Sequence, residues 1–326
     1  MKITTRILQG AALALTLAAS LPGFAQGFPN KPLKMIVPYP PGGGTDVLAR
    51  IIAPRLGEVL GQPVIIDNKP GAGGTVGATF VARAPADGYT IYIDASPGFT
   101  NSSALYKKPG FDPVKDFTAI AMVATQSNLL VVHPSFEARS VKELVAYAKS
   151  NPGKLSYATP GIGTSHHLSM ELFKKLAGLD ILHIPYRGGA PMTTDVVAGR
   201  VPVMFGTWVI VGQHLKSGRL RAIGAASKDG VRLAPDVVPI AKQGYPSFDV
   251  SSWFAFLARA GTPEAIADRI AKDTQTALAS PDVRARIEKT GLNPAPPISR
   301  SALNTRLAAD VVKWSNVVRE AGIEPR

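Results

Sequence analysis

Residues 33–52 read LKMIVPYPPGGGTDVLARII, and this stretch decides the fold. Its first residues are mostly apolar, as expected for a buried strand. A Gly-rich turn follows at 42–46, and Pro54 lies inside the segment after it, where it is expected to kink or split a helix. Strand, turn and helix in this order form the repeating unit of an α/β protein. The helix is predicted from apolar side chains at helical spacing, namely Val47, Leu48, Ile51, Ile52 and Leu56.

The same unit recurs along the chain, which predicts an α/β fold with two lobes. The first lobe adds strands at 64–67 and 89–93, separated by the Gly-rich turn 70–74 and a helix. The second lobe begins after a Pro-rich connection. Its expected elements are a helix opened by the capping box of Ser140 and Glu143, strands at 155–158, 182–184, 201–205 and 220–224, a turn at 160–165, and helices at 167–176 and 193–198.

Two apolar runs are candidates for carrying the chain between the lobes. The first consists of the apolar segments 119–123 and 129–132 with the residues between them, and the second is 252–258. A helix capped by Thr262-Pro263 and a second helix at 299–321 would then return to the first lobe. The expected division is a leader at 1–25, a first lobe at 26–124 and 250–326, and a second lobe at 125–249.

The first residues of the chain predict export. Lys2 and Arg6 precede an apolar run that ends at Leu21, shorter than the roughly 20 residues that a membrane span needs. Gly23-Phe24-Ala25 fits the small-x-small cleavage rule. This pattern is typical of a secretory signal peptide cleaved between Ala25 and Gln26, so the mature chain is expected to be periplasmic and soluble.

Composition and charge exclude several classes of protein. The chain of 326 residues is 45% hydrophobic and 18% charged, which is globular, and it has no Cys for a thiol nucleophile, a disulfide scaffold or lipid attachment. The formal net charge is +13, and it falls to +11 without Lys2 and Arg6. Because the basic residues are scattered, the positive charge is better interpreted as a solvated surface than as a nucleic-acid-binding site. Its sign is also compatible with an anionic small molecule as ligand.

The sequence lacks the motifs of common enzyme and metal sites. Gly42-x-Gly44-x-x-Val47 and Gly71-x-Gly73-x-x-Val76 both miss the third glycine of a dinucleotide fingerprint, and no Walker loop, Gly-x-Ser-x-Gly elbow or His-Glu-x-x-His is present. His166, His167 and His183 could suggest zinc, but adjacent histidines point about 100° apart on a helix. We expect one of the adjacent pair to cap or pack and the other to face solvent, with no metal and no cofactor.

The turns 38–46 and 159–165 are the positive signal for binding. Each joins a strand to a helix and is rich in Gly and hydroxyl groups. Such a turn presents backbone N–H groups at a helix N-terminus, where the helix dipole also favours a carboxylate. An alternative interpretation of each turn, taken singly, is that it only tightens a strand–helix connection, as in any α/β protein. Two such turns on facing lobes would meet across a cleft, and hinge closure would trap a ligand.

The stretch from Ile36 to Asp46, followed by Ala49-Arg50, resembles the opening motif of the Bug family, the extracytoplasmic solute receptors of tripartite tricarboxylate transporters. The resemblance spans nearly the whole mature chain and depends on the order and spacing of several motifs. The further motifs are NKPGAGG at 68–74, ADGYT at 86–90, YATPGIGT at 157–164, HIPYRG at 183–188 and DVVAGRV at 195–201.

The resemblance implies a type II-like periplasmic binding protein whose lobes, each a mostly parallel sheet flanked by helices, close on a small organic carboxylate. It implies a monomer without catalytic activity that delivers its ligand to the membrane permease subunits of a transporter. In the family, the loops matching 38–46 and 159–164 grip one carboxylate, partly through ordered water, and Ser96 and Ser127 border the cleft by analogy. The expected ligand-binding residues are Tyr39, Pro40, Gly42, Gly43, Gly44, Thr45, Asp46, Ser96, Ser127, Thr159, Gly161, Gly163, Thr164 and Trp208.

Some local interpretations stay open. Thr45-Asp46 could simply cap the first helix, and Trp208 and Trp253 could pack in the core or at the rim instead of stacking on an aromatic ligand. Thr159 stands where the family commonly has Ser, and Gly206 stands where Asp is usual. Gly206 ends a strand and is expected near the cleft, where it offers no charge to an amino group. We therefore expect an amine-free ligand, either an aromatic or a short dicarboxylic acid.

Two other functions fit an exported α/β protein of two lobes. A secreted hydrolase or lyase is one, and the absent triad and metal motifs disfavour it. The ligand-binding subunit of a membrane sensor is the other, and it would need the same binding chemistry as a transport receptor.

Overall fold

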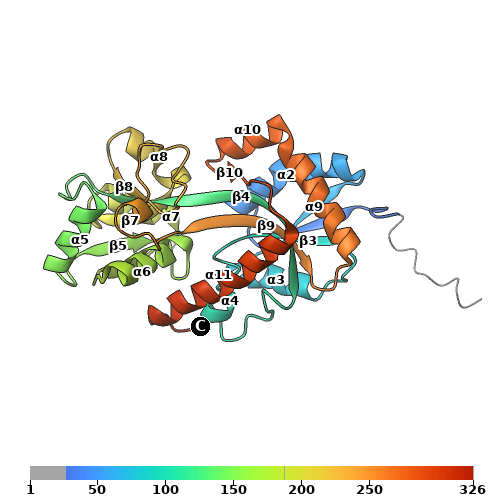
Figure 1. Ribbon diagram of the computed structural model, residues 1–326, viewed down its shortest axis with the longest axis horizontal. Coiled ribbons are helices and arrows are strands. Elements are labelled where there is room, and N and C mark those ends of the chain that lie inside the picture. Colours follow the sequence, from blue (N-terminus) through green and yellow to red (C-terminus); the bar gives the residue numbers. More distant parts are fainter. Residues whose placement is uncertain (1–26, 187, 326) are drawn as a thin grey trace, which may run out of the picture.

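The structure is a computed structural model that describes residues 27–186 and 188–325 (Figure 1). The predicted signal peptide and its cleavage point after Ala25 lie outside these residues. Among the helices that are described, none combines the length and the apolar character needed to cross a membrane.

Two α/β halves lie side by side and are joined by long central strands (Figure 1). The strands are β1 (Leu33–Val37), β2 (Val64–Asn68), β3 (Thr90–Ala95), β4 (Phe117–Val132), β5 (Ser156–Thr159), β6 (Leu182–Pro185), β7 (Val203–Thr207), β8 (Arg221–Ala225), β9 (Ser251–Arg259) and β10 (Asn293–Pro294). The helices are α2 (Gly44–Leu60), α3 (Thr75–Ala82), α4 (Ser102–Leu105), α5 (Val141–Ser150), α6 (Ser165–Ala177), α7 (Gly189–Val197), α8 (Trp208–Lys216), α9 (Glu264–Ala279), α10 (Pro281–Lys289) and α11 (Arg300–Glu320), with short 3-10 turns η1 (Ala72–Gly74) and η2 (Ile240–Lys242).

Each half is built around three parallel strands. In the first half β1 pairs in parallel with β2 and β3, and in the second half β5 pairs in parallel with β6 and β7. The strand order is β2-β1-β3-β9-β4-β7-β5-β6, and β8 and β10 also pair with β4. The turns after β1, β3 and β5 therefore leave from the carboxyl ends of parallel strands, where α/β proteins bind their ligands.

The 16-residue strand β4 carries the chain from one half to the other. Residues 117–127 pair antiparallel with β9, and residues 128–132 pair antiparallel with β7 and β8. This confirms the predicted crossover from 119–123 to 129–132. The chain returns from the second half to the first at β9. Val250, the residue before this strand, is still bonded to the second half, because its N–H donates to the carbonyl of Ala226 at 2.8 Å.

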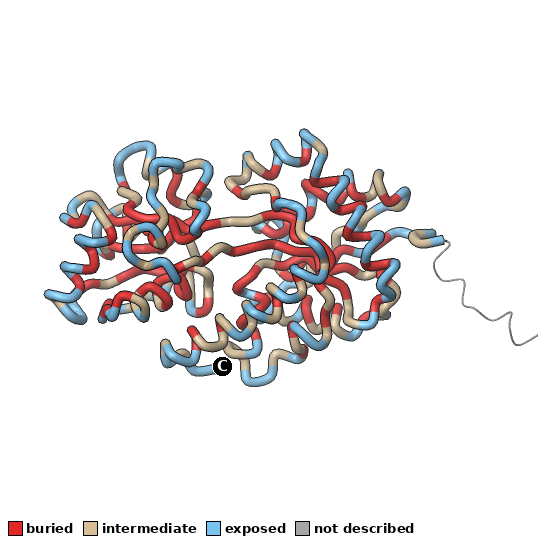
Figure 2. The backbone as a smooth tube through the Cα atoms, viewed as in Figure 1, coloured by how far each residue is buried: buried red, intermediate tan, exposed pale blue. Residues whose placement is uncertain are grey.

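Helices cover both faces of the sheet in each half, so the strands are the most buried part of the chain (Figure 2). In the first half, Ile52 of α2 and Ile270 of α9 pack on one face, and Phe99 and Leu303 pack on the other. In the second half, α5 and α6 share one apolar cluster, and α7 and α8 share another. The predicted α/β class is confirmed.

Helix α11 contacts both halves. Leu303 and Leu307 near its start belong to a core cluster of the first half, whereas Trp314 and Val318 near its end belong to a core cluster of the second half. The helix thus ties the halves together at a second place besides the central strands. The domain boundaries given above stay a prediction.

Two local expectations about helices differ from the structure. Pro54 does not split α2, which runs from Gly44 to Leu60 without a break. Pro54 is exposed, so the carbonyl that loses its partner faces water, while Ile52 and Leu56 hold the buried face together. Of the expected cap Thr262-Pro263, Pro263 is the N-cap residue of α9, whereas the hydroxyl of Thr262 donates to the carbonyl of Arg259 and does not cap the helix.

Candidate functional site

A cavity of about 330 Å³, here termed the inter-lobe cavity, lies between the two halves. The turns after β1 and β3 and the helix α4 line it from the first half, and the turn after β5 with the start of α6 lines it from the second. Gln126 of β4 and Phe254 of β9 also contribute. Its volume is at the lower end of the range for small-molecule sites. The polar part of its lining includes Tyr39, Ser96, Asn101, Gly163, Thr164 and His166.

A second cavity of about 690 Å³, termed the outer cavity, adjoins the first, because Gln126 and Phe254 line both. Its walls combine the start of α2 with Trp208 and Lys216 of α8 and with Lys289 at the end of α10. The ammonium groups of Lys216 and Lys289 thus come from opposite halves. The described residues that line the inter-lobe cavity carry no formal charge, so a carboxylate there would depend on neutral hydrogen-bond donors.

The structure divides the fourteen predicted ligand-binding residues into three groups. Four line the inter-lobe cavity, namely Tyr39, Ser96, Gly163 and Thr164. Three line the outer cavity, namely Gly42, Gly44 and Trp208. The other seven line neither cavity, namely Pro40, Gly43, Thr45, Asp46, Ser127, Thr159 and Gly161.

Asp46 holds the turn that precedes α2 in place. The helix cap is Gly43, with no side-chain hydrogen bond, so the capping role considered for Thr45-Asp46 is not what the structure has. The buried carboxylate of Asp46 instead accepts hydrogen bonds from the N–H of Gly42, Nε of Arg50 and Nδ2 of Asn68, each at 2.9 Å. Burial alone would raise the pKa of Asp46, but these hydrogen bonds lower it to about 2.

Tyr39 is fixed from behind the inter-lobe cavity by a buried carboxylate. Its hydroxyl donates to Asp94 at 3.1 Å, and Asp94 also accepts from the hydroxyl of Tyr92 at 2.6 Å and the N–H of Ala95 at 2.7 Å. Burial raises the pKa of Asp94 to about 6, against the lowering effect of these donors. The ring of Tyr39 is therefore a preformed wall of the cavity.

The turn before α6 is in contact with the first half. Thr164 caps α6 by accepting from the N–H of His167, and its hydroxyl donates to the carbonyl of Gly161 at 2.8 Å. Gly163 has a φ of +79°, and a Cβ built on it would lie 2.3 Å from Cδ1 of Leu105. Its carbonyl accepts a hydrogen bond from Nδ2 of Asn101 at 3.0 Å. The turn of the second lobe was predicted to meet the first lobe, and at Gly163 it contacts Leu105 and Asn101 of the first half.

The histidine pair differs from the expectation that one member faces solvent. His166 is 8% exposed and His167 is 3% exposed. His167 accepts from the N–H of Gly163 at 3.1 Å and stacks on His183 with ring centroids 4.1 Å apart, so it shapes the turn. His166 lines the inter-lobe cavity, and burial lowers its pKa to about 4. Among the described residues no group of three or more candidate ligands could hold a metal ion.

Several predicted hydroxyl and aromatic side chains are engaged within the protein. The hydroxyl of Thr159 lies 2.7 Å from Nε2 of His183, and that of Ser127 accepts from the N–H of Ser227 at 3.0 Å. Trp253 is a core residue whose Nε1 donates to Asp310 at 2.6 Å.

Gly206 does not face the cleft. It is buried in β7, and a Cβ built on it would lie 2.4 Å from Cγ1 of Val211, inside the apolar cluster of the second half. The expectation that this position presents itself to the ligand is wrong, because side chains alternate along a strand and residue 206 points inward. The ligand class must therefore be argued from the residues that do line the cavities.

Sequence reasoning missed Asn101 and Gln126, and it recognised His166 only as a metal candidate. A signal for Gln126 was present, because the polar run 125–128 interrupts the apolar strand β4. Lys216 and Lys289 were missed as well, since the fold alone brings α8 and α10 to one cavity.

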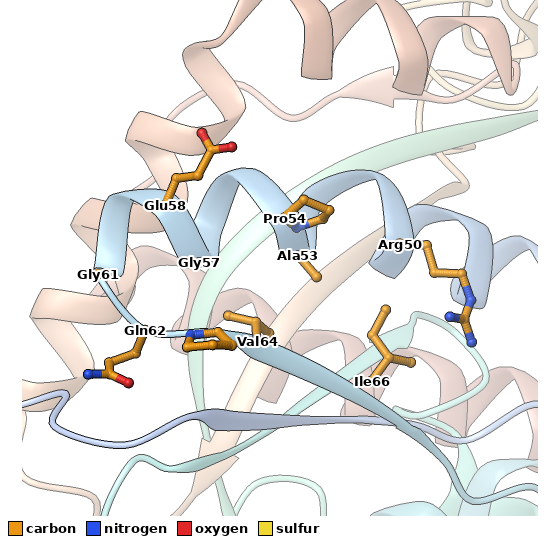
Figure 3. A pocket seen from close by; sticks show the side chains of 10 residues that line it. Arg50, Ala53, Pro54, Gly57, Glu58, Gly61, Gln62, Val64 and Ile66 are labelled. Atoms are coloured by element: carbon orange, nitrogen blue, oxygen red, sulfur yellow. The ribbon is translucent and has the colours of Figure 1, made fainter.

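A further hollow of about 730 Å³ lies outside the space between the halves. Figure 3 shows Arg50, Pro54 and Glu58 of α2 along one side of it and Val64 and Ile66 of β2 along the other. Because all its lining residues come from the first half, movement of the halves would not close it around a ligand.

Comparison with known proteins covers most of the chain. Residues 48–323 match the family described as TctC, tripartite tricarboxylate transporter family receptor. A UPF0065 protein in the tcbD-tcbE intergenic region of Pseudomonas sp. (strain P51) is 38% identical over 291 residues, which are 89% of this chain and 86% of that protein. Two solved structures, the periplasmic binding protein BugD and R. palustris Rpa4515 with adipate, are each 34% identical and cover 92% of this chain and 100% of theirs, with TM-scores of 0.73 and 0.74.

Proposed function

This chain belongs to the receptor family of the tripartite tricarboxylate transporters, and from that premise we propose that it binds a small, amine-free organic carboxylate between its halves. Proteins of this family are periplasmic solute-binding receptors with the two-lobe α/β fold, and not enzymes, so the hydrolase or lyase alternative is set aside. We further propose that the mature chain acts as a monomer and delivers its ligand to the membrane permease subunits of the transporter.

The observation that carries the proposal is the inter-lobe cavity at the start of α6. The N–H groups in the first turn of a helix have no partner within the helix, and the dipole favours an anion there. Thr164, Ser165 and His166 place this first turn in the cavity wall, opposite Tyr39 and Ser96 of the other half. A carboxylate bound here contacts both halves and therefore favours the closed arrangement.

The absence of an amino group in the proposed ligand follows from the same lining. Among the described residues around the inter-lobe cavity there is no Asp or Glu, and Asp94 behind Tyr39 is already satisfied by three donors. A buried ammonium group without a carboxylate partner is costly. The bound adipate of Rpa4515, a relative of similar fold, is an amine-free carboxylate and supports this choice.

We expect succinate to bind at least tenfold more tightly than aspartate, because the two differ only in the ammonium group that would lack a partner. Isothermal titration calorimetry of the mature protein with succinate, aspartate and benzoate measures this directly. Benzoate serves as the control for an aromatic acid with one carboxylate. Tighter binding of the amino acid would contradict the amine-free class and leave the receptor role standing.

We propose that the protein is exported and that the mature chain begins at Gln26. The charged start, the apolar run to Leu21 and the Ala25 cleavage position support this. Intact-mass analysis of a periplasmic extract should give the mass of residues 26–326. Detection of only the full-length chain in the cytoplasm would contradict both the export and the cleavage site.

A further inference from the structure

Two residues that line the inter-lobe cavity each have a buried polar atom without a hydrogen-bond partner among the described residues. The atoms are Oδ1 of Asn101, a residue with no exposed surface, and Nε2 of His166, which is 8% exposed. Both residues line the same cavity, Asn101 from the first half and His166 from the second. Because buried polar groups are almost always paired in folded proteins, this coincidence within one cavity needs an explanation.

The hydrogen-bonding roles of the two atoms follow from their neighbours. Asn101 donates from Nδ2 to the carbonyl of Gly163 at 3.0 Å, so its free atom is the carbonyl oxygen, an acceptor. Nδ1 of His166 lies 3.4 Å from the hydroxyl of Ser165. When that hydroxyl donates to Nδ1, the proton of the neutral imidazole is on Nε2, which is then a donor.

Neither atom carries a charge at neutral pH. Burial lowers the pKa of His166 to about 4, so the imidazole is neutral in the folded protein. No Asp, Glu, Lys or Arg is among the described residues that line the cavity. The Asp94 carboxylate is not part of the lining, because it lies behind Tyr39. With the His166 proton on Nε2, the cavity lining thus includes one neutral acceptor from the first half and one neutral donor from the second.

We propose that Asn101 Oδ1 and His166 Nε2 together bind an uncharged polar group of the carboxylate ligand, a hydroxyl or a carboxamide. Such a group both donates and accepts, so it can supply the donor that Asn101 Oδ1 lacks and the acceptor that His166 Nε2 lacks. A carboxylate can only accept, so it would face the oxygen of Asn101 unfavourably, and an ammonium can only donate, so it would face the N–H of His166. This inference depends on the proposed carboxylate-binding function.

The placement of His166 also relates the neutral group to the carboxylate. His166 lies in the first turn of α6, whose N–H groups are the proposed carboxylate donors. The two recognised groups must therefore be close together in the ligand. A short hydroxy acid, or the half-amide of a short diacid, meets this requirement.

Calorimetry with matched pairs of acids tests the proposal. The pairs are malate with succinate, lactate with propionate, and succinamate with succinate. We expect the wild-type protein to bind the hydroxylated or amidated member of at least one pair tenfold or more tightly, because a site built to bond such a group rejects the analogue that lacks it. His166→Leu should bring that ratio close to one, and His166→Gln, which restores a neutral N–H donor, should recover part of it.

The control is His214→Leu. His214 also has a buried ring nitrogen without a partner in the described part of the chain, but it lines a hollow between α7 and α8 in the second half and not the inter-lobe cavity. Its loss should leave the ratio unchanged. Equal binding within every pair by the wild type, or a preference that survives in His166→Leu, would overturn the inference while carboxylate binding stands. If no carboxylate binds, the proposed function fails first, and this inference fails with it.

A second measurement needs no ligand. Nitrogen-15 NMR of the imidazole of His166 should show a neutral ring with its proton on Nε2 at pH 7. A ring protonated on Nδ1, or one that is charged at this pH, would remove the donor on which the proposal depends.

Discussion

Gly163→Val is expected to abolish carboxylate binding, with a loss of affinity of more than a hundredfold, while the protein stays folded. The turn with Gly163 touches the first half, where a new Cβ would lie 2.3 Å from Cδ1 of Leu105. The branched side chain would hold the halves apart and widen the inter-lobe cavity, so a ligand could no longer contact both walls. Calorimetry measures the affinity, and circular dichroism during heating checks the fold.

Gly178→Val is the matched control for this variant. Gly178 ends the same helix α6 and has a φ of +64°, so a side chain costs about 1–2 kcal/mol of backbone energy there, as at Gly163. A Cβ added at Gly178 would meet no described atom within 4 Å, so affinity should stay at the wild-type level.

Leu105→Ala separates the steric effect from the backbone effect. Combined with Gly163→Val, it should recover part of the lost affinity, because it removes the clashing methyl groups. Wild-type affinity in the single variant Gly163→Val would mean that this turn plays no part in binding.

Asp46→Ala should lower the free energy of unfolding by about 2–4 kcal/mol and weaken carboxylate binding, because it removes the shared acceptor of three hydrogen bonds. The N–H of Gly42 and the amide of Asn68 would lose this partner, and the turn before α2 would loosen. Tyr39 would be affected too, since its carbonyl also accepts from Asn68 at 3.0 Å. Urea denaturation and calorimetry measure the two effects.

Asp273→Ala is the control for Asp46→Ala. Asp273 is 7% exposed and pairs with Arg269 one turn earlier on α9, at 2.6 Å, away from both cavities. Its loss should cost stability and leave affinity unchanged. Equal losses of affinity in the two variants would show that the effect of Asp46 is a general loss of stability and not a local one.

The pH dependence of stability gives a further check on Asp46. Its folded pKa of about 2 lies below the ordinary value of 3.8, so the ionised form is favoured by folding. The resulting stabilisation is present above pH 4 and is lost as the pH falls toward 2. Because Arg50 is half exposed and solvent screens the pair, the contribution is about 1–2 kcal/mol. Asp46→Asn should flatten the wild-type decline over this range, and a parallel decline would contradict the assignment.

The sequence by itself determined most of the elements and their order, although it did not indicate α4, α8, α10 or β10. The spacing of Leu48, Ile52 and Leu56 marked α2, and Ser140 with Glu143 marked the start of α5, where the Ser140 hydroxyl accepts from the N–H of Glu143. These signals are local, since periodicity and capping depend on residues within a few positions of one another. The length of the apolar run through 132 likewise indicated the crossover strand β4. Several short motifs in a fixed order were enough to indicate the receptor family.

Only the tertiary structure decided which side chains face the space between the halves. Asp46 and Thr159 belong to the predicted turns, yet both are engaged within the protein, and Gly206 points into a core. Asn101 and His166, 65 positions apart, meet at one cavity because α4 and the start of α6 approach across the halves. Contacts between distant segments decide which partner a polar group has and which face of a strand or helix meets the ligand. The physical reason is that burial and hydrogen bonding are set by packing and not by neighbours in sequence.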